Sequence, residues 1–103
     1  MQLLIVFDCD ADIIEVPQSI IDERDVLSRR FWKWLSNKSN KHQYWTTFKD
    51  SSGKQWTGLR YRGDAFVEWL NKKVLKNTNE KSYVLHMHVD INDYEKELPS
   101  IYF

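Results

Sequence analysis

The chain of 103 residues has little of several features that define large classes of protein. It contains a single cysteine, Cys9, which excludes an internal disulfide. The apolar run near the amino end, Leu3 to Phe7, is far too short for a secretory signal, and no segment is long enough for a membrane-spanning helix. We therefore expect a reduced, cytoplasmic protein that folds as one domain over residues 1–103.

The sequence also lacks a net charge, because 15 basic residues balance 15 acidic ones. The charges are nevertheless segregated along the chain. Residues 1–26 hold seven acids and one base, residues 27–81 hold thirteen bases and four acids, and residues 82–103 hold four acids and one base. The two sets could neutralise each other in the fold, or the basic middle could face an anionic partner.

What the sequence has in excess is aromatic residues, which make up 15% of the chain and include five tryptophans and five tyrosines. Side chains of this size stabilise a small core or an interface. The apolar and turn patterns predict strands at residues 2–7, 43–49, 55–60 and 82–89, and helices at 19–36 and 64–76. The chain is expected to stay extended through Val16, and Asp50 to Gly53 predicts the turn of a hairpin. The helical spacing in the first helix predicts a buried stripe of Ile20, Leu27, Phe31, Trp34 and Leu35.

This order of elements predicts an α+β fold of the ferredoxin-like βαββαβ type. Such a fold is a four-stranded antiparallel sheet with two helices on one face, and the first strand lies at the centre of the sheet. The unbroken apolar run Leu3 to Phe7 predicts that both faces of this strand are covered. We therefore expect residues 94–103 to form a tail that packs on the sheet, or a partner subunit to cover it.

The element order, together with Asp8 at the end of the first strand, resembles the Cas2-type family of ferredoxin-like nucleic-acid-binding proteins. The resemblance implies that Asp8 faces the same residue of a dimer mate and is the candidate catalytic residue of a metal-dependent phosphodiesterase. In such a dimer, Asp8, Asp10 or Asp12 could hold Mg²⁺ through carboxylate oxygens. The alternative is that these three acids are solvated loop residues.

His86 and His88 lie on one face of the last predicted strand, a spacing that can supply two metal ligands. If the first and last strands run antiparallel, His88 lies nearer Gln2 than Asp8. The histidines and the acids then form no common site. We accordingly expect no resident cofactor, with a divalent metal as the alternative.

The predicted hairpin interleaves aromatic and basic residues, which is typical of surfaces that bind single-stranded nucleic acid. The candidate residues for a macromolecular partner or nucleic acid are Trp45, Lys49, Trp56, Arg60 and Arg62. Alternation along the strands divides the aromatic residues between two faces, so half of them are expected in the core.

No complete catalytic set is visible in the sequence. We therefore predict a small non-enzymatic binding protein that acts through a protein partner or as a homodimer. Nucleic-acid binding by the hairpin is the first alternative, and the metal-dependent phosphodiesterase is the second.

Overall fold

The structure is a computed structural model that describes residues 1–8 and 10–103, so Cys9 lies outside the described residues. The elements follow in the order β1 (Gln2–Val6), β2 (Ala11–Glu15), α1 (Gln18–Asp22), α2 (Arg24–Ser36), β3 (Trp45–Lys49), β4 (Gln55–Leu59), α3 (Gly63–Trp69), the π-helical turn η1 (Leu70–Val74), β5 (Tyr83–Val89), α4 (Ile91–Tyr94) and β6 (Ser100–Tyr102). The broad α+β prediction is confirmed.

The main sheet has the strand order β5-β2-β1-β6 and is mixed, because β6 runs parallel to β1 while the other pairs are antiparallel. The predicted ferredoxin-like sheet of four antiparallel strands is therefore not what forms. The chain turns back after β1, where the Phe7 amide donates to the Asp10 carbonyl at 2.8 Å. The extended segment through Glu15 then pairs with β1 and occupies one of its edges, and β6 occupies the other. No edge of β1 remains for the predicted hairpin.

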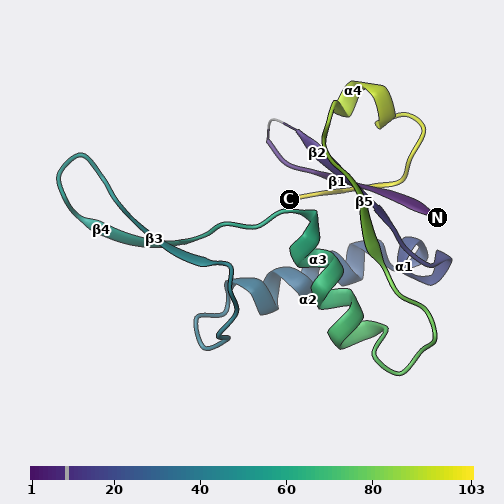
Figure 1. Cartoon of the computed structure of the whole chain (residues 1–103), viewed down its shortest axis with the longest axis horizontal. Helices are drawn as coiled ribbons and strands as arrows, with labels where there is room; N and C mark the ends of the chain where they lie inside the picture. Colours follow the sequence, from purple (N-terminus) through teal and green to yellow (C-terminus); the bar gives the residue numbers. More distant parts are fainter. Residues whose placement is uncertain (9) are drawn as a thin grey trace.

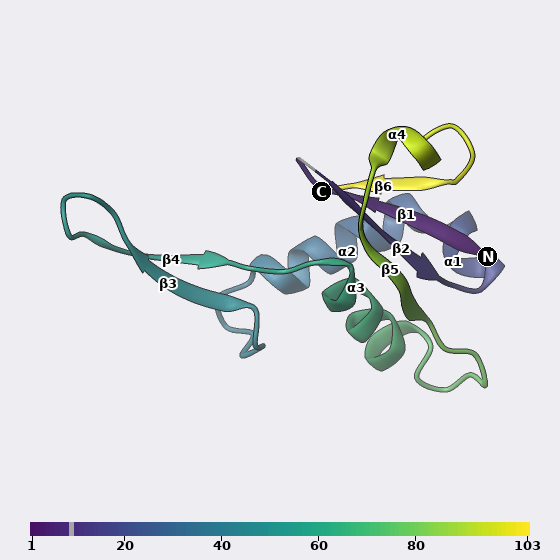
Figure 2. The ribbon, with the colours of Figure 1, turned by 45° about the horizontal axis from the view of Figure 1, so that its top comes forward.

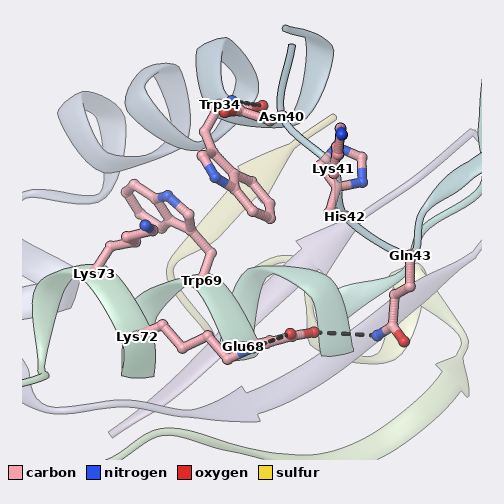
Figure 3. Close-up of a pocket in the computed structure, with 9 residues that line it drawn as sticks. All are labelled: Trp34, Asn40, Lys41, His42, Gln43, Glu68, Trp69, Lys72 and Lys73. Atoms are coloured by element: carbon pink, nitrogen blue, oxygen red, sulfur yellow. Dashed lines mark hydrogen bonds and ion pairs between the residues drawn. The ribbon is translucent and has the colours of Figure 1, made fainter. Parts of the chain in front are cut away.

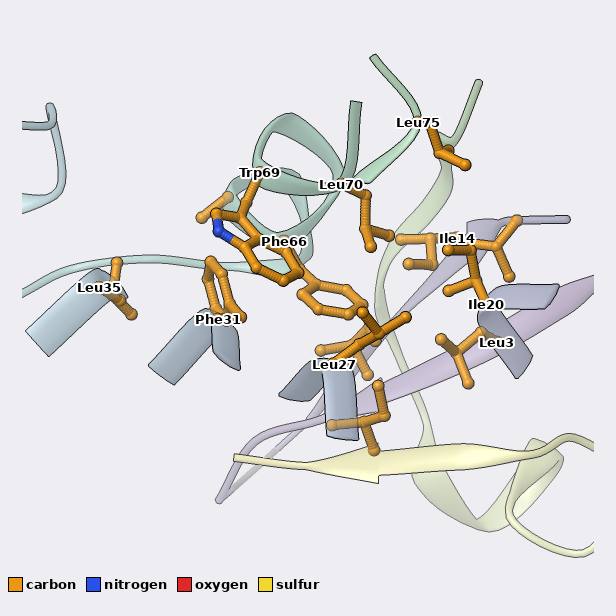
Figure 4. Close-up of a cluster of buried hydrophobic side chains, with 14 of the residues drawn as sticks. Leu3, Ile14, Ile20, Leu27, Phe31, Leu35, Phe66, Trp69, Leu70 and Leu75 are labelled. Atoms are coloured by element: carbon orange, nitrogen blue, oxygen red, sulfur yellow. The ribbon is translucent and has the colours of Figure 1, made fainter. Parts of the chain in front are cut away.

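One face of the sheet packs against α1, α2 and α3 (Figure 4). The helical spacing predicted this buried stripe of α1 and α2, and Ile20, Leu27, Phe31 and Leu35 are buried as expected, although the helix is interrupted at Glu23. The Phe31 ring lies at the centre of the packing, with ring centroids 5.2 Å from Phe66 and 5.7 Å from Trp69 in edge-to-face contacts. Aromatic burial thus accounts for much of this core.

The other face of the sheet is covered by the segment from α4 to Leu98 (Figure 2). Leu4 and Ile13 are buried on this face, and Ile91, Tyr94 and Leu98 pack against the same cluster. The sequence predicted a cover for this face and named the carboxyl-terminal tail or a partner subunit. In the structure Ser100–Tyr102 instead extends the sheet as its edge strand β6.

The β3–β4 hairpin forms a separate two-stranded sheet that projects from the rest of the molecule (Figure 1). The radius of gyration is 14.8 Å, against about 13 Å for a compact chain of this length. The structure therefore has an arm, and this arm is the predicted hairpin. None of the helices formed by residues 1–8 and 10–103 has the length and apolar character needed to cross a bilayer.

Candidate functional site

The outer part of the hairpin carries two exposed aromatic side chains on one face. Phe48 is paired with Trp56 across the two strands, and the two side chains are 54% and 45% exposed. A Cβ atom on Gly58 would lie only 3.1 Å from Phe48 Cε1, so the Phe48 ring covers bare backbone. Alternation predicted that half of the hairpin's aromatic residues are buried. Phe48 stays in solvent because the hairpin does not join the main sheet.

One basic side chain lies against these rings, and two others are exposed elsewhere on the arm. The Lys54 ammonium lies 4.4 Å from the centroid of the Trp56 ring, and Lys49 and Arg60 are exposed. We call Phe48, Lys54 and Trp56 the hairpin patch. It combines flat apolar surface with positive charge, which is the chemistry of single-strand nucleic-acid binding.

The acid in the hairpin turn is engaged by the turn itself. The Asp50 carboxylate accepts hydrogen bonds from the backbone amides of Ser52 at 2.9 Å and Lys54 at 3.0 Å, and from the Trp56 indole at 3.0 Å. Hydrogen bonds from the Ser52 hydroxyl and the Trp56 indole lower the pKa of Asp50 to about 2. Its negative charge thus stabilises the turn and orients Trp56.

The base of the hairpin is anchored to the helices. Trp45 is half-buried, its indole donates to the Asn40 carbonyl at 2.8 Å, and its ring stacks on His42 with centroids 5.1 Å apart. Tyr44 is buried and its hydroxyl donates to Glu68, and burial together with this carboxylate raises the pKa of Tyr44 to about 12. Trp45, one of the predicted partner-binding residues, therefore helps to hold the arm in place.

The structure places Arg62 away from the hairpin patch, directly before α3, with its side chain against the main sheet. Its Nη1 donates to Asp10 Oδ1 at 2.7 Å, and its Nε and Nη2 donate to the two carboxylate oxygens of Asp12. The guanidinium carbon also lies 4.7 Å from the centroid of the Phe7 ring. Arg62 thus belongs with Asp10 and Asp12 rather than with Trp56 and Arg60.

Asp12 is the fully buried acid of this group, with an exposed fraction of 0%. It lies between Ala11 and Ile13, whose side chains face α4, so its own side chain faces α3. There it accepts the Gly63 amide at 2.8 Å and the His88 amide at 3.1 Å in addition to Arg62. A buried carboxylate is tolerated here because each of its hydrogen-bond partners donates to it.

His88 reaches the acids because β5 pairs with β2 and not with β1. The pairing joins Ala11 to Val89, so the end of β5 lies beside the start of β2. A register shift between Ala11 and Ile13 accompanies a positive φ of 56° at His88, whose Nδ1 lies 2.7 Å from Asp10 Oδ2. The expectation that strand order separates the acids from His88 is wrong, since it assumed that the first and last strands pair.

Asp10 and Asp12 are bound to Arg62 and do not form an open group of ligands. Hydrogen bonds from Arg62, and then from His88, lower the pKa of Asp10. Asp8 and His86 are exposed. Among residues 1–8 and 10–103, no group of three or more histidine, cysteine, aspartate or glutamate side chains is arranged to hold a metal ion. Metal ligation by Asp8, Asp10, Asp12, His86 or His88 was only the alternative to no resident metal, and both expectations stay predictions.

A feature that the sequence argument missed is a cavity of about 400 Å³ between α2 and α3 (Figure 3). Trp34, His42 and Trp69 line it together with Lys41, Lys72 and Lys73. In the sequence, Trp34 belongs to the apolar stripe of its helix, Lys72 and Lys73 belong to the basic outer face of the next helix, and Lys41 lies in the connection between them. Only the crossing of α2 and α3 and the fold of the connection at residues 40–43 bring them together.

Comparison of the chain with protein-family models, with curated proteins and with solved structures gives no match.

Proposed function

We propose that the protein is a binding protein, rather than an enzyme, and that its β3–β4 hairpin contacts a macromolecular partner. The observation that carries the proposal is the pair of exposed rings, Phe48 and Trp56, on an arm that projects from the body. Covering a large apolar side chain contributes roughly 1.5–3 kcal/mol, and an isolated two-stranded hairpin gains stability from any surface that packs on it. A partner on this face would cover the two rings and would also stabilise the hairpin.

The charge of the arm supports nucleic acid as one such partner. Lys54 lies against the Trp56 ring, Lys49 and Arg60 are exposed, and the turn itself uses the charge of Asp50. Bases stacked on Phe48 and Trp56 would place a phosphate near Lys54, and Lys49 and Arg60 add positive charge to the arm. Each base stacked on an aromatic side chain contributes about 1–3 kcal/mol. The other candidate partners are a protein and a second copy of the chain.

The test compares the wild type with the double variant Phe48→Ala, Trp56→Ala. Fluorescence anisotropy with labelled single-stranded and double-stranded oligonucleotides at low salt measures nucleic-acid binding, and size exclusion with light scattering measures self-association. The matched control is Trp32→Ala, because Trp32 is equally exposed, at 47%, but lies on α2. We expect the hairpin variant to weaken the interaction at least about tenfold and the control to leave it unchanged.

The proposal would be wrong if a partner were found whose affinity the hairpin variant does not change. It would also be wrong if the wild type at micromolar concentration stayed monomeric and bound neither nucleic acid nor any protein. A steep loss of affinity with rising salt would identify nucleic acid, because lysine contacts to phosphates release counterions.

A further inference from the structure

The cavity between α2 and α3 has the size of a small-molecule site. Its volume is about 400 Å³, and such sites range from about 300 to 1,000 Å³. Trp34 descends into it from α2, Trp69 rises from α3, and the connection that carries His42 closes one end (Figure 3). The cavity is therefore bounded by flat aromatic side chains from three separate segments.

The aromatic wall is held in place before any ligand arrives. His42 Nδ1 accepts the Tyr44 amide at 3.2 Å, so the proton of the neutral ring lies on Nε2, which donates to the Leu35 carbonyl at 2.8 Å. The His42 ring also lies 4.8 Å from Trp34 and is stacked on Trp45. With both nitrogens engaged by backbone and its ring packed against Trp34 and Trp45, His42 holds the Trp34 indole in place, and little ordering is needed on binding.

Trp69 is held on the opposite side of the cavity by the core. It is 4% exposed and stacks on Phe66 with centroids 6.0 Å apart. Phe31 contacts it edge-on, and the Arg30 guanidinium lies 5.6 Å from the centroid of its ring. The indole edge that borders the cavity is therefore fixed by packing behind it.

Positive charge exceeds negative charge around the cavity. Three ammonium groups line it, from Lys41, Lys72 and Lys73, against the single carboxylate of Glu68 among the lining residues. Glu68 is already engaged by Lys72 at 2.6 Å and by the Tyr44 hydroxyl, and these two contacts lower its pKa. Subtracting one carboxylate from three ammonium groups leaves two positive charges for a ligand.

We propose that this cavity binds a planar aromatic anion of the size of a nucleoside monophosphate. The aromatic ring of the ligand lies against the half-buried Trp34 indole and meets the edges of His42 and Trp69, and its anionic group faces Lys41 and Lys73. The volume accommodates one such ligand rather than a run of stacked bases. The site is separate from the hairpin patch, which lies on the arm that projects away from α3 (Figure 1).

The experiment follows the five tryptophan indole N–H signals of the full-length chain by NMR. The probes are the four common nucleoside monophosphates, with adenosine and inorganic phosphate as separate arms. We expect saturable movement of the Trp34 and Trp69 signals with at least one nucleotide, and weaker binding of adenosine and of phosphate alone. The Trp32 and Trp56 signals should stay in place. If no nucleotide moves the Trp34 and Trp69 signals at millimolar concentration, the proposal is overturned.

A pair of charge reversals tests the role of the lysines. Lys41→Glu with Lys73→Glu should weaken nucleotide binding roughly tenfold or more, because each lysine contributes a charge-assisted contact. Both side chains are exposed, so the fold should tolerate the change. The control is Lys38→Glu with Lys81→Glu, which alters the net charge equally at exposed positions outside the cavity lining. If both double variants weakened nucleotide binding equally, the loss would reflect only the net charge of the protein, and the site would be refuted. Equal affinity for inorganic phosphate and for nucleotide would also refute it, because the aromatic part of the ligand would then contribute nothing.

Discussion

Replacing Asp12 by asparagine should destabilise the protein severely, although the change removes no atom from the side-chain outline. The side chain is buried completely and its two oxygens serve different donors. Oδ1 accepts the His88 amide and Arg62 Nη2, whereas Oδ2 accepts the Gly63 amide and Arg62 Nε. Asparagine has one oxygen, so in either orientation its NH₂ group faces one backbone amide and one guanidinium nitrogen.

The magnitude follows from those two lost contacts. A buried backbone amide left without an acceptor costs about 1–3 kcal/mol. Losing a fully buried ion pair costs about 3–5 kcal/mol, but the Arg62 side chain is 26% exposed and can recover part of this in water. We expect the free energy of unfolding to fall by about 2–4 kcal/mol, a large share of the 5–15 kcal/mol typical of a domain.

Urea denaturation followed by circular dichroism measures this loss, with an unchanged slope showing that the variant still unfolds in two states. Asp8→Asn is the matched control, because it makes the same chemical change at an exposed position of the same segment. It should change the stability by no more than about 0.5 kcal/mol. In an Arg62→Met background the cost of Asp12→Asn should shrink, since only the backbone contact is then lost. A loss below about 1 kcal/mol for Asp12→Asn would refute the reasoning.

Two further predictions concern the same segments. Gly63→Ala should destabilise the protein by about 1–3 kcal/mol, because the new Cβ would lie 3.0 Å from both Cβ and Oδ2 of Asp12, and thermal unfolding measures it. The hairpin turn should loosen in acid. Because folding lowers the pKa of Asp50 to about 2, its stabilising contribution is complete above the ordinary pKa of 3.8 and is lost as the pH falls through about 2. The Trp56 indole signal in NMR should follow this titration in the wild type and not in Asp50→Asn; identical pH profiles would contradict the assignment.

Local patterns predicted the elements well because each pattern is decided within a few residues. Most of the apolar run, Leu3 to Val6, formed a strand with both faces covered, and the turn at Asp50 to Gly53 joined the two strands of the hairpin. The helical stripe through Leu27 and Phe31 is buried as predicted. These outcomes depend on side-chain spacing and turn chemistry, which the sequence displays directly.

The cluster of Asp10 and Asp12 with Arg62 and His88 was harder to predict because its contacts join distant parts of the chain. Asp12 meets Arg62 across 50 residues and His88 across 76. A signal was present, since an acid among Ala11, Ile13 and Ile14 in an extended segment requires a buried donor. The sequence did not identify that donor, and the assumed strand order pointed away from His88.

By itself, the sequence determined the α+β class, the central apolar strand, the amphipathic helix and the hairpin with its aromatic and basic residues. Only the tertiary structure decided that Ala11–Glu15 and Ser100–Tyr102 occupy the two edges of β1, which leaves the hairpin as a free arm. The physical reason is that a strand has two edges, and the segments that can pair there compete through the packing of the whole chain. The same competition brought Asp10 and Asp12 to Arg62 and left Phe48 and Trp56 in solvent.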